Sequence, residues 1–511
     1  MVGRITGAQP GDDSLLLVGA DVRTLDPSRP RATSVLIRRR RIAWVGDDPE
    51  GAVPPDCQKL DLTGTIVQPA FVNAHTHLTA LGLMLGAVDL AMTESLEDCL
   101  AAIRAMVGVT TDPLIWAVGW DETRWPEHRA PTADELTAAG DGRPVMLSRA
   151  DGHCVAVDRI SLIALPLARA RGVERGPDGR PTGILRQEAA QTATRWFAAE
   201  LPPSTLTAAR SRAATALAEA GVASAHEMGG PHRMGPDDFD AWMQGEWPIE
   251  VVPYWGDADL EFVAERGLRR VGGSLLLDGT VGSHSAALTE PYADKGGSGQ
   301  LYLDTTELAD FALQATHKGV QVALHAIGDR AVEQAATVFE SVAEQIGTDQ
   351  LRRLRHRLEY AVLIGAAEVQ RLADLGVVVT AQPANDLDLA AFGGSYEQRL
   401  GPVRARAANP LGALHRAGVP LAFGSDKLEA LDPWASVHSA VTHHDAANRM
   451  SGDDALWAAT IGGRVAARQP NVGPLRIGHR ADLAVFDGEG GRCLLTIVAG
   501  TVVHGMALVH S

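Results

Sequence analysis

The sequence predicts an α/β fold: a (β/α)8 TIM-like barrel with a small β-sandwich domain that is built from both chain ends. The first observation is that apolar strands alternate with helical patterns through the middle of the chain, as in βα units around a parallel sheet. The second is their number, since eight such strands match the count of a closed barrel. The third is that residues 14–66 and the segment from Asp482 onward carry short strands with turns, too few at either end to fold alone.

The eight predicted strands are apolar, and several end in a polar residue that can carry chemistry. The first ends at His77, and the others span residues 221–226, 249–254, 274–278, 320–325, 356–360, 377–382 and 419–426. The length from the first strand to the last exceeds the roughly 250 residues of a typical barrel. This excess predicts an insertion at about 85–200, after the first strand. We therefore expect a β-sandwich domain at 1–69 and 468–511, and a barrel at 70–467.

The composition narrows the classes of partner. The 511 residues carry a formal net charge of -17, which argues against a nucleic-acid partner. The basic run Arg38–Arg41 lies between two strand-like segments and is predicted to be a turn. The four cysteines show no CxxC spacing, which is typical of a protein in a reducing compartment. The sequence contains no apolar stretch of about 18 residues, so no membrane span is predicted. We expect a cytoplasmic protein with no membrane partner, and a possible homodimer.

His75 and His77 end the first predicted strand, after the apolar run 65–74. Side chains alternate faces along a strand, so residues i and i+2 point the same way. Neutral imidazole is the commonest protein ligand for zinc and its neighbours, and both rings can therefore reach one metal ion. Chance or core packing explains most such pairs when they stand alone, so the prediction depends on further ligands.

His325 ends the fifth predicted strand, and Asp426 ends the eighth. The carboxyl ends of the strands form one rim in a barrel, so these residues are expected to meet His75 and His77 there. Three imidazoles and a carboxylate leave room for a water on one divalent ion if the site expands to five ligands. The predicted cofactor is one divalent metal ion, with zinc as the expected identity. Asp426 is expected to be a ligand and also to accept the proton of the water. Taken singly, His325 is explained as well by core packing, and Asp426 by a loop or a helix cap.

Three further residues are expected to bind substrate: His153 and Trp120 in the insertion, and His284 after the fourth strand. Each has an alternative. A surface hydrogen bond explains His153 as well as a substrate contact does, and core packing is the simpler account of Trp120. His284 follows the Asp278–Gly279 loop, and its expected position faces the pocket, with a position outside the pocket as the alternative.

Several motifs spread over the chain belong to one known pattern. They are Phe71–His77, Gly119–Asp121 with Trp125 and Pro131–Thr132, Arg149–His153, Leu277–Ser283, His325–Ala331, Arg355–Glu359, Gly424–Asp426 and Gly478–Leu483. On these motifs the chain resembles the amidohydrolase superfamily and, within it, the branch of YtcJ-like hydrolases that includes N-substituted formamide deformylases. The resemblance covers nearly the whole chain. It implies that a metal-bound hydroxide attacks a C–N or similar polar bond.

Two positions depart from the family pattern. Members of this branch usually carry Glu-His after the sixth strand, where this chain has Glu359 and Tyr360. Members with a bridging carboxylated lysine carry it four residues before the Asp-Gly of the fourth strand, where this chain has Ser274. Both losses remove the usual means of holding a second metal, so a mononuclear site is expected. Tyr360 is expected to donate a hydrogen bond to the developing oxyanion; a phenolate ligand and simple space-filling are the alternatives.

The leading functional prediction is a metal-dependent amidohydrolase that cleaves an amide-like C–N bond of a small-molecule substrate. A deaminase or another non-amide hydrolase on the same scaffold is the first alternative, and ammonia detection on a substrate panel separates the two. A catalytically retired binding protein is the second, motivated by Ser274 and Tyr360. The fold alone does not choose among them, because one barrel hosts many chemistries.

Overall fold

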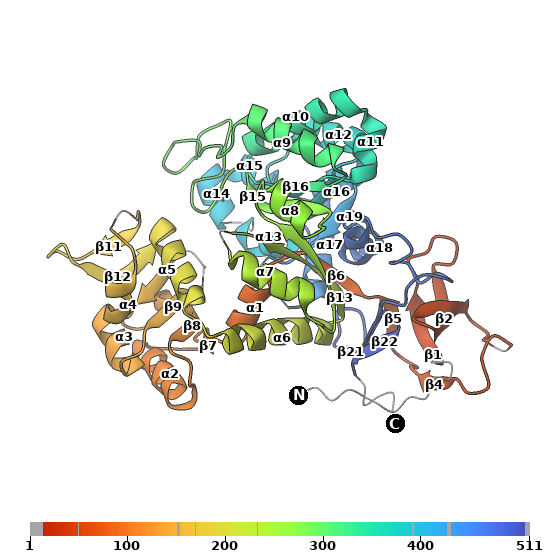
Figure 1. Ribbon diagram of the computed structural model, residues 1–511, viewed down its shortest axis with the longest axis horizontal. Coiled ribbons are helices and arrows are strands. Elements are labelled where there is room, and N and C mark those ends of the chain that lie inside the picture. The colour runs from red at the N-terminus through yellow and green to blue at the C-terminus, as the bar shows by residue number, and fades with distance from the viewer. Residues whose placement is uncertain are drawn as a thin grey trace. The chain divides into compact units, whose positions relative to one another are not determined.

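In the computed structural model the protein consists of two compact units (Figure 1). Unit 1 comprises residues 1–77, 214–230 and 239–511, and unit 2 comprises residues 78–213 and 231–238. The structure describes residues 14–49, 51–150, 154–168, 170–231, 233–390, 393–426 and 431–505. Within these ranges no helix is both long and apolar enough to cross a bilayer.

Unit 1 contains a sheet of eight parallel strands in the order expected of a (β/α)8 barrel. Along the sheet they are β6 (Phe71–Thr76), β13 (Val222–Gly229), β14 (Glu250–Trp255), β15 (Arg270–Leu276), β16 (Gln321–Ala326), β17 (Arg357–Tyr360), β18 (Val378–Ala381) and β19 (Leu421–Phe423). All seven pairings between neighbours are parallel. The predicted fold class is confirmed.

The first and last barrel strands are joined just beyond their carboxyl ends. The backbone N–H of Asp426 donates to the carbonyl of His75 at 3.1 Å. The Asn73 amide donates to Ser425 Oγ at 2.8 Å, and the Ser425 N–H donates back to Asn73 Oδ1 at 3.0 Å. This seam brings the end of β6 beside the segment after β19, and it holds two of the predicted metal-binding segments together.

Helices connect the strands, and their apolar faces explain why they form. The helices with bounds inside or partly inside unit 1 are α6 (Pro203–Glu219), α7 (Gly235–Gln244), α8 (Leu260–Glu265), α9 (Thr305–His317), α10 (Asp329–Ile346), α11 (Thr348–Leu354), α12 (Ala366–Leu375), α13 (Pro383–Leu389), α14 (Ser395–Leu400), α15 (Pro402–Arg406), α16 (Leu411–Arg416), α17 (Pro433–Val441), α18 (Gly452–Trp457) and α19 (Gly463–Ala466). In α10 the buried residues Ala331, Ala335, Val338 and Val342 recur every three or four positions, which is the period of one helix face. The N-cap of α9 is Asp304, whose carboxylate accepts from the backbone N–H of Thr306 and of Glu307.

Both chain ends form one small β domain with its own core, as predicted. Its strands are β1 (Ser14–Arg23), β2 (Arg31–Arg38), β3 (Arg41–Gly46), β4 (Gln58–Asp61), β5 (Ile66–Pro69), β20 (Leu483–Phe486), β21 (Cys493–Val498) and β22 (Thr501–His504). The N-terminal strand β5 pairs with the C-terminal strand β20, and apolar side chains from both ends share one cluster. Arg39 and Arg40 have positive φ angles of 50° and 68° between β2 and β3, so the basic run is the predicted turn.

A buried ion network ties the β domain to the barrel within unit 1. Arg464 of α19 binds Asp482 at 2.7 Å, and both side chains are at most 3% exposed. The same guanidinium also bonds Glu250, which begins β14. Arg480 pairs with Glu250 and Asp482 as well. Because burial of an unpaired charge is costly, this closed network makes the junction between the two parts of the unit specific.

Unit 2 has its own sheet, and its residues 78–213 include the whole of the predicted insertion at about 85–200. The strand order is β11 (Val173–Arg175), β12 (Pro181–Arg186), β10 (Cys154–Val157), β9 (Val145–Arg149), β8 (Ile115–Trp120) and β7 (Val88–Asp89). Its helices include α1 (Leu78–Met84), α2 (Leu96–Val109), α3 (Ala133–Gly140), α4 (Arg159–Ala164) and α5 (Gln187–Ala199). Two apolar clusters lie within it. The domain boundaries proposed from the sequence stay a prediction.

Candidate metal centre

His75 and His77 lie at the carboxyl end of β6, where the predicted alternation brings both rings to one side. His75 is 2% exposed and His77 is 8% exposed. Asp426 Oδ1 lies 3.7 Å from His75 Nε2 and 3.4 Å from His77 Nε2. One ligand atom from each of the three residues falls within 4.8 Å of the other two. The sequence prediction for these three residues thus corresponds to a compact group.

Glu359, at the end of β17, orients the His75 ring. Its Oε2 lies 2.8 Å from His75 Nδ1, and the carboxylate is fully buried. An ionised carboxylate only accepts, so His75 carries its proton on Nδ1 and leaves the Nε2 lone pair toward Asp426. A carboxylate behind a histidine in this way fixes the tautomer and raises the basicity of a metal ligand.

Arg357, two residues earlier on β17, holds this carboxylate in place. Its Nε donates to Glu359 Oε1 at 2.7 Å and its Nη2 to Oε2 at 3.0 Å. The same guanidinium donates to the Ala74 carbonyl at 2.7 Å and contacts His226 Nδ1 at 2.9 Å. Arg357 and Glu359 are both 0% exposed. A charged group buried this deeply without a partner would become neutral by gaining or losing a proton, so each of the two charges depends on the other.

The protonation of this group follows from that pairing. Burial alone would raise the pKa of Glu359, but the charges and hydrogen bonds of Arg357 and His75 outweigh it and lower that pKa. Burial would lower the pKa of Arg357, and Glu359 reverses this shift as well. Burial, followed by the charge of Arg357, holds the pKa of His226 well below its usual range. Glu359 is therefore a carboxylate, and His226 is a neutral ring.

Tyr360 binds Asp426, the third residue of the group formed with His75 and His77. Its hydroxyl donates to Asp426 Oδ2, while Oδ1 faces the two imidazoles. Its ring lies edge-on to His75, with centroids 5.4 Å apart. Tyr360 and Asp426 have positive φ angles of 74° and 44°, a region that non-glycine residues seldom adopt. Such backbone strain gathers at functional sites, where the surroundings hold it in place.

Gly424 leaves room for the His75 backbone. A Cβ atom on Gly424 would lie 2.6 Å from both the Cβ and the N of His75, closer than such atoms approach. The Gly424 N–H donates to the carbonyl of Ala381 at 3.0 Å. The glycine in this motif thus lets three strand ends, those of β6, β18 and β19, meet without a side chain between them.

His325 lies at the same rim but outside the compact group. It pairs with Glu359 in the β16–β17 register, so both side chains share the interior face of the sheet. Its ring centroid is 4.5 Å from that of Tyr360, and it is 7% exposed. Among the described residues the three-member group consists of His75, His77 and Asp426. A fourth ligand at His325 stays a prediction.

The segment after His325 is anchored by Asp278. Its carboxylate accepts from the backbone N–H groups of Ile327 at 3.0 Å, Gly328 at 2.7 Å and Ala287 at 2.8 Å. Burial raises the pKa of Asp278 to about 6, although these three donors favour the charged form. The Asp-Gly motif of the fourth strand therefore orders the loop beside His325.

The remaining predicted residues have other surroundings. His284 Nε2 lies 2.9 Å from both carboxylate oxygens of Asp294, which also pairs with Arg399. Trp120 is 1% exposed in an apolar cluster of unit 2, beside Trp125, as the core-packing alternative expected. His153 lies outside the described residues. Substrate contacts for the three stay predictions.

Arg357 and Glu359 were given no role in the sequence prediction. The signal was present, because residues i and i+2 of a strand share a face, as in the pair at 75 and 77. The motif Arg-Leu-Glu places two opposite charges on the interior face of a strand that ends at the rim. A buried charge needs a partner, and each of these two is the partner of the other.

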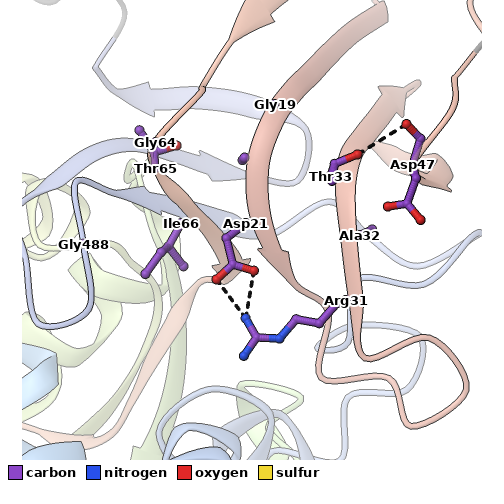
Figure 2. A pocket seen from close by; sticks show the side chains of 11 residues that line it. Gly19, Asp21, Arg31, Ala32, Thr33, Asp47, Gly64, Thr65, Ile66 and Gly488 are labelled. Carbon is purple, nitrogen blue, oxygen red and sulfur yellow. Dashed lines mark hydrogen bonds and ion pairs between the residues drawn. The ribbon is translucent and has the colours of Figure 1, made fainter.

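A wide hollow lies elsewhere, on the β domain (Figure 2). Its volume is about 660 Å³, and it is lined by residues such as Gly19, Ala20, Asp47 and Thr65. Arg31, one of the lining residues, donates to both Asp21 oxygens at 2.8 Å. None of the described residues that line it belongs to the metal group. We therefore assign the chemistry to the barrel rim rather than to this hollow.

The donor set at the rim suits a divalent ion. Two neutral imidazoles with a carboxylate are the ligands of several catalytic zinc sites, which keep a further position open for water. The Glu359 carboxylate behind His75 is the orienting partner that such ligands have. His75, His77 and Asp426 would hold the ion.

Comparison with known proteins agrees with the motifs. The amidohydrolase family model matches residues 58–506. Protein LONG AFTER FAR-RED 3 of Arabidopsis thaliana is 29% identical over 92% of this chain and 87% of its own length. N-substituted formamide deformylase of Arthrobacter pascens is 26% identical over 94% of both chains. The crystal structure of an uncharacterized metal-dependent hydrolase from Pyrococcus furiosus matches with a TM-score of 0.76 and 26% identity, over 93% of this chain and 99% of that one. The chain therefore belongs to the amidohydrolase family, as its motifs predict, and has the fold of a metal-dependent hydrolase.

Proposed function

We propose that this protein is a mononuclear metal-dependent hydrolase that cleaves an amide-like C–N bond of a small molecule. The observation that carries the proposal is the group of His75, His77 and Asp426, with Glu359 bound behind His75. Similarity to an N-substituted formamide deformylase supports an amide-like bond as the substrate. Zinc is the proposed ion, because two imidazoles and a carboxylate suit it.

The roles of the residues follow from their contacts. A bound divalent ion would supply an acidified water and polarise the scissile carbonyl. Asp426 would offer Oδ1 to the ion and would accept the proton of the water, while the Tyr360 hydroxyl donates to Oδ2. Glu359 keeps the His75 Nε2 lone pair available. His325 stands next to Tyr360, where it can act as a further ligand or contact the leaving group.

Two positions support one metal ion rather than two. The hydroxyl of Ser274 donates to the Met228 carbonyl at 3.0 Å and offers no carboxylate for bridging. Tyr360 occupies the position where family members usually carry histidine, and its hydroxyl is engaged by Asp426. Metal analysis of zinc-reconstituted protein should thus give about one equivalent per chain, and two tightly held ions would contradict the proposal.

The reaction is tested on zinc-loaded protein with N-benzylformamide, followed by release of formate and benzylamine. Acetanilide and adenine serve as an unrelated amide and a deaminase substrate, with ammonia detection for the latter. We expect amide cleavage that is lost in His77→Ala together with the metal. Ammonia release without amide cleavage would identify a deaminase. Metal binding without turnover of any amide would favour a retired binding protein.

A further inference from the structure

The side-chain amide of Gln382 is buried at the rim of the barrel, and the described residues offer it no hydrogen-bond partner. It directly follows β18, and its side chain is part of a residue that is only 4% exposed. Both Oε1 and Nε2 are shielded from solvent, and neither has a partner among the described residues. Most buried polar groups are paired, so an amide with neither half satisfied calls for an explanation.

The strand register directs this side chain to the interior of the barrel. Thr380 pairs with Glu359, whose carboxylate lies inside the barrel against His75. Residues opposite each other in a sheet share a face, and so do residues i and i+2. Pro383 begins α13 and favours an extended backbone for the residue before it. Gln382 therefore continues the interior face of Thr380, one layer closer to the rim.

That layer is the layer of the metal group. The carbonyl of Ala381, the residue before Gln382, accepts from the Gly424 N–H at 3.0 Å. Gly424 in turn lies directly against the backbone of His75. Gly424 thus contacts both the residue that precedes Gln382 and the backbone of His75.

We propose that Gln382 orients the substrate, with its Oε1 accepting from a substrate N–H and its Nε2 donating to a substrate carbonyl. This donor and acceptor pair is complementary to an amide or carbamoyl group, and it sets the substrate class of the same site. The inference rests on the proposed function. An unsatisfied amide costs the free protein stability, and that cost is recovered when a substrate supplies the missing partners.

The chain offers a matched control in Gln68. This residue of β5 is 0% exposed, and both of its amide atoms also lack a partner among the described residues. It pairs with Ala484 in the sheet of the β domain. Gln68→Met and Gln382→Met make the same nearly volume-conserving change, one in the β domain and one at the rim.

The first measurement is thermal unfolding of both variants. Removing a buried, unpaired amide should raise Tm by about 1–3 °C in each case, with zinc content unchanged. A fall in Tm for Gln382→Met would mean that the amide is paired within the protein, and it would overturn the proposal.

The second measurement is the binding of acetohydroxamic acid to zinc-loaded protein by calorimetry, which requires no turnover. Its N–H and carbonyl present the donor and acceptor that Gln382 would meet. We expect Gln382→Met to raise Kd on the order of 10-fold and Gln68→Met to leave it unchanged. Equal Kd values for Gln382→Met and wild type, equal weakening in both variants, or no binding by wild type would each overturn the inference. Hydroxamate binding that depends on Gln382, in a protein that cleaves no amide, would instead refute the proposed reaction alone.

Discussion

Glu359→Gln is the substitution that tests the metal group most directly. The carboxylate accepts three hydrogen bonds, two from Arg357 at 2.7 and 3.0 Å and one from His75 at 2.8 Å. Glutamine has one acceptor oxygen and an NH2 group that only donates. In one orientation of the glutamine amide the NH2 group takes the place of Oε1 and faces Arg357 Nε; in the other it takes the place of Oε2 and faces His75 Nδ1 as well as Arg357 Nη2. In that second orientation the ring must carry its proton on Nε2, the atom that would bind the ion.

The expected magnitudes follow from this conflict. Loss of an orienting carboxylate behind a metal-binding histidine weakens metal affinity by about 10–100-fold. The buried Arg357 charge also loses its counter-charge, which costs about 3–5 kcal/mol of stability when both groups are fully buried. The variant should therefore bind zinc more weakly and unfold at lower denaturant concentration.

The assay is zinc titration against a competing chelator, with denaturant unfolding of the metal-free protein beside it. The double variant Arg357→Met, Glu359→Gln separates the two effects. Without the guanidinium, the glutamine oxygen is free to accept from His75 Nδ1, so the correct tautomer returns. We expect the double variant to bind zinc more tightly than Glu359→Gln alone. A folded Glu359→Gln protein with the zinc Kd of wild type would refute the reasoning.

Three further predictions concern the rim and the core. Tyr360→Phe keeps the ring contacts but frees Asp426, so zinc affinity in the same titration should fall on the order of 10-fold; a loss of kcat on the order of 10²-fold with unchanged zinc binding would instead support the oxyanion role. Gly424→Ala forces a methyl group against His75 and should lower both zinc affinity and stability, by about 1–3 kcal/mol in denaturant unfolding; an unaffected protein would mean that the backbone yields there at little cost. Burial lowers the pKa of His356 to about 3, so the unfolded chain takes up a proton there before the folded one does. Stability should consequently fall as the pH drops from about 6.5 toward 3, and His356→Gln should flatten this slope in unfolding measured across that range; an unchanged slope would exclude the residue as a source of acid sensitivity.

The part of the site that the sequence predicts follows from the alternation of side chains along a strand, in which every second residue lies on the same face. This alternation places His75 and His77 on one face, and the rule that strand ends share a rim brings Asp426 to them. The same alternation applies to Arg357 and Glu359, which were missed because a charge on a predicted strand is more often taken for an exposed side chain. Their burial depends on the register of β17 against its neighbours, which the sequence of one strand does not contain.

Other features depend on geometry that no local pattern encodes. Tyr360 and Asp426 meet because both adopt positive φ angles at the ends of their strands. The extended conformations of a normal strand end would point these side chains elsewhere. The sequence therefore predicted Tyr360 as an oxyanion donor, a metal ligand or a space-filling residue, and it did not predict the hydrogen bond to Asp426. The burial of Trp120, by contrast, follows from a general rule, because large apolar side chains usually pack in a core, as Trp120 does in unit 2.

The departure from the family pattern at Tyr360 supports a site that has been reorganised rather than lost. The Tyr360 ring packs against the rings of both His75 and His325, with centroid distances of 5.4 and 4.5 Å. Its hydroxyl binds the carboxylate oxygen that faces away from the imidazoles. A site that no longer needed its metal would have no reason to retain a strained backbone at both Tyr360 and Asp426, or a fully buried ion pair behind His75. The proposed one-metal hydrolase would account for these costs together, because it would use the arrangement that they maintain.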